Sequence, residues 1–576
     1  MNINKTIAFC LPMAILFSTL ASSAKDKPGA TIPWTTYEAE NMNTNGTIMG
    51  PSYEPYKVET ESSGQKCVKL NAKGQYVEFS ALSKANSIII RYSLPDAKQG
   101  NGTSATLAIY KNSNLVEEVK ISSRYTWLYG KYPFTNDPGA GEQRNFYDEV
   151  RLSGFIFEKG DVIRIQLDGG KADNADYCII DLADLENIPP PSAAPKNSFS
   201  ITDISFAGKG AIEDYTDAFK KCIAAAISQQ KTVWIPPGVY KITGDIVLPD
   251  NVTIQGAGMW HTTLVGDENL YNDASRRVRL KGNGSNIHLL DFAIVGKLNY
   301  RNDNEPNDGI VGSFGTSSTI SGIWVEHTKV GMWIQNSSNL TITRCRMRNT
   351  IADGINFCVG MNKSTIENCT ARGTGDDCFA FWPAVFEPQQ FEPGHNLVAH
   401  CTGQLPFLAN GAAIYGGDSN AVKNCLFTDI SQGSAILIST TFPTENKEVN
   451  NNFRGATVVE NCDIKNSGGF DHEWDWRASV EVCVDRRSIS GIEIRDINIT
   501  NSLSNGVNVI AKNVGDKQGV LSNAVLQNIT VSGVGIGAKD SYGLFVSTGA
   551  HGSITVKNSN IATNKNTAAD FVVNSQ

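Results

Sequence analysis

The sequence predicts an all-β protein in which a right-handed parallel β-helix follows an antiparallel β-sandwich. Three observations predict this architecture: a short phrase that recurs along the latter part of the chain, a set of alternating strands ahead of it, and one amphipathic helix between the two. With 576 residues the chain is too long for one ordinary core, so two domains are expected.

The recurring phrase is apolar–polar–polar–apolar and returns every 24 to 37 residues. Its copies end at Cys345, Cys369, Cys401, Cys425, Cys462, Ile497, Ile529 and Ser559. Short β-branched strands separated by Gly and Asn are typical of a solenoid whose coils stack about 4.8 Å apart. A leucine-rich repeat would need helical segments or a regular Leu spacing, and neither is present. Because the last position accepts Cys or Ile, it is a small buried slot, and we expect free thiols there rather than disulfides or zinc.

An amphipathic helix is predicted over residues 217–230, just before the strands that begin at Val233. Ala218, Cys222 and Ala226 share one stripe of this helix. Thr216 is its expected N-cap. A helix at this place predicts a cap over the open N-terminal end of the β-helix.

The sandwich is predicted over residues 25–188, a Pro-rich connector over 189–198, and the β-helix over 199–576. Alternating strands separated by Gly, Asn and Asp turns are expected at 76–79, 87–92, 105–110 and 162–167. Cys67 and Cys178 could form a disulfide if their strands are neighbours.

Residues 1–24 have the pattern of a secretory signal peptide, with Lys5, an apolar run, and small residues before the expected cut after Ala24. The apolar run is shorter than a membrane span, and no other stretch qualifies. We therefore expect a secreted protein, extracellular or periplasmic, that does not sit in a membrane. The net charge of −8, with no basic stripe, argues against nucleic acid as a partner. We expect a monomer.

Three aspartates are the candidate catalytic residues. Asp353 and Asp377 each follow a repeat cysteine by eight residues, so they fall in one column of the stack, and Asp376 is adjacent. Gly373 and Gly375 suggest a bend that lets both neighbouring acids reach one surface. Crowded carboxylates need a proton, a metal or chemistry to compensate their charge. One protonated acid beside ionised neighbours suits glycoside hydrolysis; the alternative is a structural Asp ladder capped by turn amides.

Aromatic and polar residues near these acids indicate a groove that binds sugar. The candidates are Trp382, Tyr415, Asp418 and Trp474, the last in an inserted loop over residues 470–476. Aromatic faces beside hydrogen-bonding groups are what a carbohydrate site requires.

These motifs carry a family resemblance. Residues 349–354 and 375–377 resemble the catalytic signatures of polygalacturonase-like β-helix hydrolases, and residues 348–356 with 373–380 look most like glycoside hydrolase family 87, the α-1,3-glucanase and mycodextranase family. The resemblance implies an inverting enzyme, most simply endo-acting, that cleaves α-1,3-glucosidic linkages in mutan- or nigeran-type α-glucan and needs no cofactor for catalysis. It implies Asp376 as the general acid, with Asp353 and Asp377 holding the water.

Departures from the polygalacturonase pattern favour a neutral substrate. The Gly-His-Gly and Arg-Ile-Lys elements that would follow the acids are missing, so nothing obvious binds a uronate carboxylate. Two alternatives stay open: a pectin- or uronate-acting hydrolase or lyase, for which Arg372 is the nearby candidate base, and a non-catalytic solenoid that binds polysaccharide.

The first domain resembles calcium-containing β-sandwich carbohydrate-binding modules. The resemblance rests on residues 37–40 and 177–184, and it implies Glu38, Glu40 and Asp181 as ligands of a structural calcium. The alternative is that these are solvated acids of edge strands. We expect the domain to aid attack on insoluble substrate without contributing to the chemistry.

Overall fold

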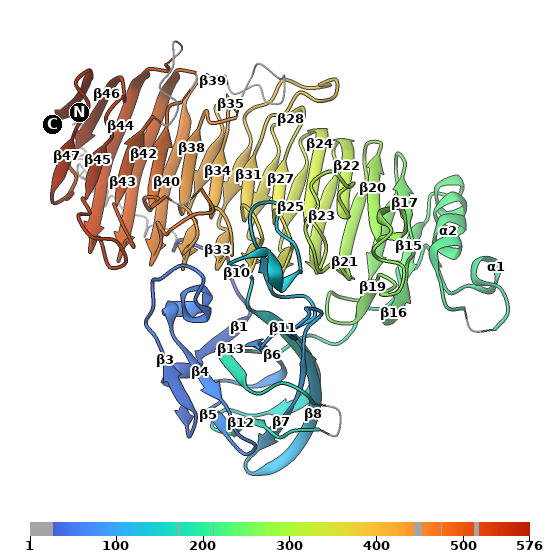
Figure 1. Ribbon diagram of the computed structural model, residues 1–576. Helices are drawn as coiled ribbons and strands as arrows, with labels where there is room; N and C mark the ends of the chain where they lie inside the picture. The colour runs from blue at the N-terminus through green and yellow to red at the C-terminus, as the bar shows by residue number, and fades with distance from the viewer. Residues whose placement is uncertain are drawn as a thin grey trace, which may run out of the picture.

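The computed structural model describes residues 27–170, 173–210, 212–442, 452–473, 475–485, 487–511 and 518–576. It confirms the predicted architecture: an antiparallel sandwich precedes a long stack of parallel strands (Figure 1). The signal peptide predicted at 1–24 and the candidate Trp474 lie outside the described residues. No helix in the described ranges is both long and apolar enough to cross a membrane.

Two antiparallel sheets form the sandwich. The first contains β1 (Trp34–Glu38), β3 (Thr47–Met49), β4 (Cys67–Leu70), β6 (Ala85–Ser93), β11 (Asp148–Phe157) and β13 (Cys178–Glu186). The second contains β2 (Asn43–Thr44), β5 (Tyr76–Ser80), β7 (Ser104–Lys111), β8 (Asn114–Ser122) and β12 (Val162–Leu167). A separate pair, β9 (Leu128–Tyr129) and β10 (Gln143–Arg144), lies outside both sheets. Cys67 and Cys178 are unbridged and pack in different apolar clusters, so the disulfide considered above does not form.

The β-helix carries its strands in two long parallel sheets. The 13-stranded sheet contains β17 (Asp245–Leu248), β20 (Arg279–Asn283), β22 (Gly309–Thr316), β24 (Met332–Ser338), β27 (Ile355–Phe357), β28 (Met361–Asn362), β31 (Phe379–Phe381), β34 (Ala412–Ile414), β38 (Ile436–Ser439), β41 (Val480–Cys483), β43 (Val507–Ile510), β45 (Leu544–Val546) and β47 (Asn564–Asn566).

The 20-stranded sheet contains β14 (Ser198–Ser200), β15 (Thr232–Ile235), β16 (Gly238–Lys241), β18 (Thr253–Gly256), β19 (Thr262–Val265), β21 (His288–Val295), β23 (Thr319–Glu326), β25 (Thr341–Thr343), β26 (Arg346–Arg348), β29 (Thr365–Glu367), β30 (Thr370–Arg372), β32 (Leu397–Ala399), β33 (Thr402–Gln404), β36 (Ala421–Lys423), β37 (Leu426–Thr428), β40 (Thr457–Lys465), β42 (Ile489–Thr500), β44 (Leu521–Ser532), β46 (Gly552–Lys557) and β48 (Phe571–Ser575). A two-stranded pair, β35 (Gly417–Asp418) and β39 (Phe453–Arg454), lies beside the stack.

The recurring phrase forms one corner of each coil. Asn368 and Asn424 adopt left-handed backbone conformations, with φ of 51° and 54°, which Asn tolerates better than most residues. The bend turns the next residue, Cys369 or Cys425, into the core, where both thiols are unbridged and buried. Each thiol also donates to the carbonyl two residues earlier, at 3.3 Å for Cys369. The prediction of a stack of free thiols is therefore confirmed.

A helix covers the N-terminal end of the β-helix, as predicted. Helix α2 (Thr216–Ser228) buries Phe219 and Cys222 in the core cluster of the coils, and a short helix, α1 (Ile204–Ala207), precedes it (Figure 1). The N-cap is Tyr215 and not Thr216. Thr216 lies in the first turn because the Asp214 carboxylate accepts its backbone N–H at 2.8 Å and so supplies the cap.

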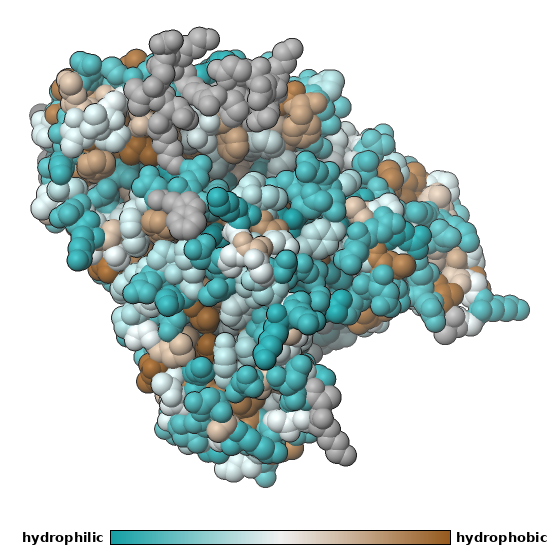
Figure 2. All heavy atoms as spheres, viewed as in Figure 1, coloured by the Kyte–Doolittle hydropathy of each residue, from teal (hydrophilic) through white to brown (hydrophobic). Residues whose placement is uncertain are grey.

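Buried ion pairs join the sandwich to the β-helix. Glu186 accepts two hydrogen bonds from Arg346, at 2.7 and 2.9 Å, and Arg372 binds both Glu149 (2.6 Å) and Asp184 (2.8 Å). All five side chains are at most 8% exposed. Apolar residues form only small separate patches on the face drawn in Figure 2. Ile89 of the sandwich also packs against Ala293 and Trp324 of the β-helix. The domains therefore meet across a buried interface that contains both ion pairs and apolar contacts.

Candidate active site

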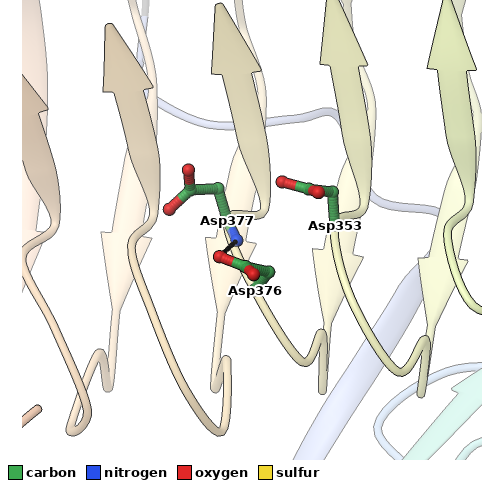
Figure 3. A group of neighbouring side chains, drawn as sticks. All are labelled: Asp353, Asp376 and Asp377. Atoms are coloured by element: carbon green, nitrogen blue, oxygen red, sulfur yellow. Dashed lines mark hydrogen bonds between the residues drawn. The ribbon is translucent and has the colours of Figure 1, made fainter. Parts of the chain in front are cut away.

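Asp353, Asp376 and Asp377 gather on the outer edge of the 13-stranded sheet, just before β27 and β31 (Figure 3). One carboxylate oxygen of each lies within 4.8 Å of the other two. The register aligns Ile355 with Phe379, which puts Asp353 and Asp377 in one column, as the spacing predicted. Asp376 is the most exposed of the three, at 24% of its side chain, while the other two are buried.

A glycine bend brings the adjacent pair to one surface. A Cβ at Gly375 would lie 2.0 Å from the Ile351 carbonyl oxygen, so no other residue fits without a shift of the backbone. Gly373 has φ of +71°, in the left-handed region. Asp376 and Asp377 consequently line the same groove instead of pointing to opposite faces of a regular strand.

The site holds more negative charge than its surroundings neutralise. Burial, then Asp376 and Asp377, raises the pKa of Asp353 well above its ordinary value. Burial and Asp376 also raise the pKa of Asp377 to about 7, although Asn410 and Tyr415 donate hydrogen bonds to it at 2.8 and 3.0 Å. The buried pair therefore keeps a proton to higher pH than isolated carboxyl groups do. That proton, with one nearby arginine, compensates the cluster.

The arginine is Arg301, on the loop between β21 and β22. All five of its N–H groups donate hydrogen bonds. Nε donates to Asp303, and Nη1 donates to the carbonyls of Gly375 and Ile351. Nη2 donates to the Tyr132 hydroxyl and, at 2.7 Å, to Asp376. Asp376 thus carries the ion pair that its two neighbours lack.

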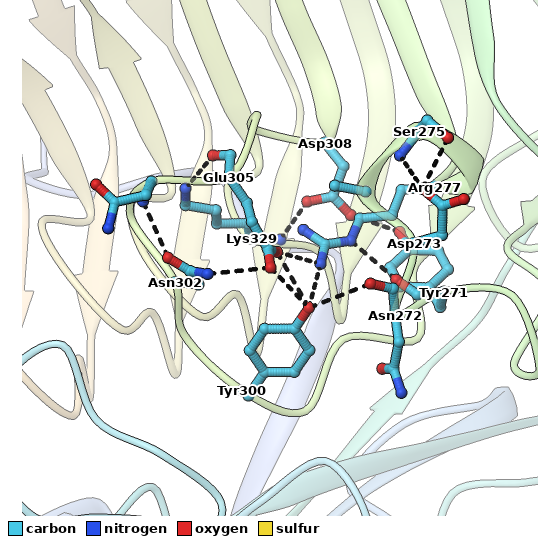
Figure 4. Close-up of polar contacts among 12 residues, drawn as sticks. Tyr271, Asn272, Asp273, Ser275, Arg277, Tyr300, Asn302, Glu305, Asp308 and Lys329 are labelled. Carbon is cyan, nitrogen blue, oxygen red and sulfur yellow. Dashed lines mark hydrogen bonds and ion pairs between the residues drawn. The ribbon is translucent and has the colours of Figure 1, made fainter.

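Further polar contacts hold the Arg301 loop in place (Figure 4). Glu305 accepts hydrogen bonds from Tyr300, Asn302 and Arg277, and Lys329 Nζ donates to its backbone carbonyl at 2.7 Å. Asp308 accepts from Tyr271. Arg301 is therefore preorganised, with no ligand needed to order it.

A groove extends from the acids in two directions. Its aromatic half, a cleft of about 700 Å³, is lined by Trp333, Trp382 and Phe386 and reaches back to β20. Its polar half is lined by Gln432, Asp471, His472, Arg477 and Glu481 and reaches forward to β41. Four residues line both halves: Tyr132, Asp376, Tyr415 and Phe442. The acids therefore lie where the two halves meet.

The structure places the four residues that were predicted to contact sugar differently. Trp382 lines the aromatic half, and its buried indole N–H has no hydrogen-bond partner among the described residues. Tyr415 lines the groove but donates its hydroxyl to Asp377. Asp418 is misassigned: it lies in β35, outside the lining of either half, and accepts from the Ser419 hydroxyl at 2.6 Å. Trp474 lies outside the described residues.

Several groove residues were missed by the sequence analysis. Trp333 pairs in register with Asn356, so extending the repeat one coil back would have found it. Phe386, 56% exposed, lies near Trp382 with ring centroids 6.2 Å apart. Tyr132 belongs to the sandwich, and no sequence signal pointed to it. A side chain of the sandwich therefore lines the groove beside the acids, which argues against the expectation that this domain contributes nothing to the chemistry.

The candidate calcium ligands fit a cation in part. Glu38 and Glu40 each have a buried carboxylate oxygen without a hydrogen-bond partner, and burial, then Asp181 and Glu40, raises the pKa of Glu38 to about 8. Asp181 differs, because Ser63 N–H and the Arg91 guanidinium occupy its two oxygens. Uncompensated oxygens are what a hard cation binds. Glu38 and Glu40 therefore each offer an oxygen that a cation could use, and Asp181 does not.

Three acids in an open groove on a parallel β-helix define a carbohydrate-active hydrolase. Comparisons with known proteins identify the family. The α-1,3-glucanase catalytic domain D1 matches residues 31–188, and the α-1,3-glucanase catalytic domain D2 matches residues 215–574. The chain belongs to the GH87 α-1,3-glucanase family and is a glycoside hydrolase.

Solved structures agree with this assignment. The catalytic domain of Agl-KA is 25% identical, with a TM-score of 0.85 over 95% of this chain and 98% of that one. The catalytic unit of a thermostable GH87 α-1,3-glucanase from Streptomyces thermodiastaticus strain HF3-3 is 29% identical, with a TM-score of 0.79 over 95% and 96%. A GH87 α-1,3-glucanase variant in complex with tetrasaccharides is 26% identical, with a TM-score of 0.82 over 95% and 99%. Comparison with curated proteins found no match.

Matched GH87 structures also include variants in which one of three aspartates is replaced by alanine, some in complex with nigerose. Those aspartates are separated by 23 and 1 residues, the separations of Asp353, Asp376 and Asp377 here.

Proposed function

We propose that this protein hydrolyses internal α-1,3-glucosidic linkages of an α-glucan with inversion at the anomeric carbon. The observation that carries the proposal is the acid cluster at the junction of two groove halves, with the same separations as the aspartates varied in GH87 structures. A groove that continues on both sides of the acids accommodates a chain that extends past the scissile bond, which favours endo action. As in glycoside hydrolases generally, the chemistry calls for no cofactor.

We assign Asp376 as the general acid and Asp353 with Asp377 as the pair that holds and activates the water. Asp376 is the acid exposed to both halves of the groove, where the glycosidic oxygen would lie. In one turnover Asp376 gives its proton to the leaving oxygen, and the pair takes a proton from the attacking water. That step leaves Asp376 ionised and the pair protonated. A proton passing from the pair to Asp376 resets the enzyme.

The inverting outcome rests on the resemblance and the three-acid arrangement, not on acid spacing. Inverting enzymes usually separate acid and base by about 6.5–9.5 Å, whereas here the nearest oxygens lie within 4.8 Å. Proton NMR of the first product distinguishes inversion from retention, because inversion of an α-linkage releases the β-anomer. The α-anomer would contradict the proposal.

A neutral substrate is favoured over a uronate. The arginines that line the groove are already paired, Arg279 with Asp245, Arg301 with Asp303 and Asp376, and Arg477 with Asp471. Two lysines, Lys281 and Lys329, also line the aromatic half. Arg372, the candidate base of a lyase, is buried in the domain interface against Glu149 and Asp184. The test is incubation with α-1,3-glucan, alternating α-1,3/α-1,4-glucan, β-glucan and pectin. Reducing ends from the first two alone support the proposal, while an unsaturated product from pectin would indicate a lyase.

We further propose that the protein is secreted after cleavage near Ala24, and that calcium is held by Glu38 and Glu40 as a structural ion. The supports are the pattern of residues 1–24 and the two buried carboxylate oxygens without partners. N-terminal sequencing of protein recovered from the culture medium or periplasm tests the first point.

A further inference from the structure

Among the described residues, the sandwich reaches the groove through one segment, the sandwich arm (residues 130–142, between β9 and β10). Phe134 anchors the arm: it is buried in the apolar cluster of the β-helix, together with Leu128. Figure 1 shows the segment around β10 lying against the middle of the β-helix. Tyr132, two residues before the anchor, lines both halves of the groove. Phe134 therefore docks the arm on the β-helix, and Tyr132 faces the site.

The Tyr132 hydroxyl lies inside the hydrogen-bond network of the acids. It accepts from Arg301 Nη2 at 3.0 Å and donates to Asp303. The same Nη2 donates to Asp376 at 2.7 Å. The Tyr132 ring covers the guanidinium, 4.8 Å from its carbon, and lies 5.5 Å from the His472 ring. One side chain of the sandwich therefore holds the nitrogen that pairs with a catalytic carboxylate.

We propose that Tyr132 is a positioning residue of the catalytic centre, which fixes the orientation and charge of Asp376 through Arg301 and so makes the sandwich part of the chemistry. The inference rests on the proposed role of Asp376 as an acid of the reaction. A tyrosine suits this task because its neutral hydroxyl bridges the cation and Asp303 without adding charge.

Two acids compete for Arg301. Asp303 binds its Nε at 3.0 Å, and Asp376 binds its Nη2. Tyr132 donates to Asp303 and gives Nη2 a second acceptor, which keeps the guanidinium plane facing Asp376. Without the hydroxyl, Arg301 has an unsatisfied N–H and a stronger pull from Asp303, so its pair with Asp376 weakens. The groups that face Asp376 are Arg301, Asp353, Asp377, Tyr132, Tyr415 and His472.

The experiment compares the full-length wild type with Tyr132→Phe, Arg301→Gln and the control Tyr110→Phe, whose hydroxyl only accepts from Gln166 on the sandwich surface. Tyr132→Phe keeps the ring over Arg301, so folding is retained, and we expect kcat on α-1,3-glucan to fall roughly tenfold with KM within about twofold. An ion pair favours the ionised carboxylate. Weakening it makes the acid harder to deprotonate, so the alkaline limb of the pH–rate profile moves to higher pH, by about one unit in Arg301→Gln and less in Tyr132→Phe.

Each outcome decides something. A shift of the alkaline limb supports the inference with Asp376 as the acid, and a shift of the acidic limb supports it with Asp376 as the base. Limbs and kcat equal to those of Tyr110→Phe overturn it. If the wild type cleaves no glucan, the proposed function fails, yet the inference is still tested by carbon-13 NMR of the carboxyl groups. There the Asp376 signal, assigned with Asp376→Asn, must titrate at higher pH in both variants, and an unchanged titration overturns the inference.

Discussion

At the scale of single residues, the site depends on unequal surroundings for three identical side chains. Asp353 is buried beside two acids, Asp377 accepts from Asn410 and Tyr415, and Asp376 is paired with Arg301. The same carboxyl group therefore meets burial and like charge in one place and a cation in another, and such unequal surroundings are what separate acid from base in catalysis.

Replacing Asp353, Asp376 or Asp377 by Asn should each lower kcat by about 10²–10⁴-fold, because either the proton donor or the base for the water is lost. The fold should survive, since all three side chains face the groove and not the inward stack. Reducing-sugar release and circular dichroism measure the two effects. Asp418→Asn, outside the groove, is the matched control, and near-normal turnover in any of the three variants would show the assignment to be wrong.

Activity should decline as pH rises through about 7. The acid cluster needs one proton to supply a general acid, and the pKa of Asp377 is raised to about 7 while that of Asp353 is raised as well. Raised values mean that the proton is present at lower pH and lost above them, so the alkaline limb of kcat/KM should lie near neutrality and belong to the cluster as a whole. A profile flat from pH 6 to 9 would contradict the charge state described here.

At the scale of elements, each coil is a set of very short strands joined by fixed bends. The bend at Asn368 and its equivalents turns a small side chain inward, and the same bends place the acid column just ahead of β27 and β31. The repeat length therefore sets the positions of both the buried side chains at the bends and the column of acids.

Cys369→Val and Cys425→Val should each cost less than about 1.5 kcal/mol in unfolding free energy, because the slot accepts Ile in register at Ile497. Valine fills the volume and forfeits weak hydrogen bonds of the thiol, including the one that Cys369 Sγ accepts from the Cys345 N–H at 3.4 Å. Urea unfolding gives the cost, and thiol counting on denatured, unreduced protein gives the redox state. Quantitative disulfides among the five repeat cysteines would refute the buried-thiol stack.

Calcium should raise the midpoint of thermal unfolding, and a chelator should lower it, since an ion that binds only the folded state stabilises it by mass action. Glu38→Gln should abolish that response while leaving a folded sandwich. Scanning calorimetry with and without calcium measures it. Glu118→Gln, on an exposed stretch of β8, is the control. A calcium response unchanged in Glu38→Gln would remove this residue from the site.

At the scale of the whole molecule, the two domains share a buried interface and one groove. Their interface buries arginines against acids of the other domain, and it carries the sandwich arm to the groove. The match of the sandwich to a catalytic domain model agrees with this arrangement.

Glu186→Gln should destabilise the protein by about 3–5 kcal/mol, because Arg346 would be left as an uncompensated buried charge. Denaturant unfolding followed by tryptophan fluorescence measures this. Stability within about 0.5 kcal/mol of wild type would show that the interface charges are solvated in solution and not buried as described.

The sequence by itself determined the fold class, the repeat, the capping helix and the column of acids. All of these are local or periodic: a fixed step between Cys345 and Cys369 is enough to align Asp353 with Asp377. The tertiary structure alone decided the partners of those acids. Arg301 reaches Asp376 across 75 residues and Tyr132 reaches Arg301 across 169, from another domain. Contacts at such separations leave no period or spacing in a single sequence, because they depend on how two independently patterned domains dock. For the same reason Asp418, near the acids in sequence, lies outside the groove, while Tyr132, far from them in sequence, lines it.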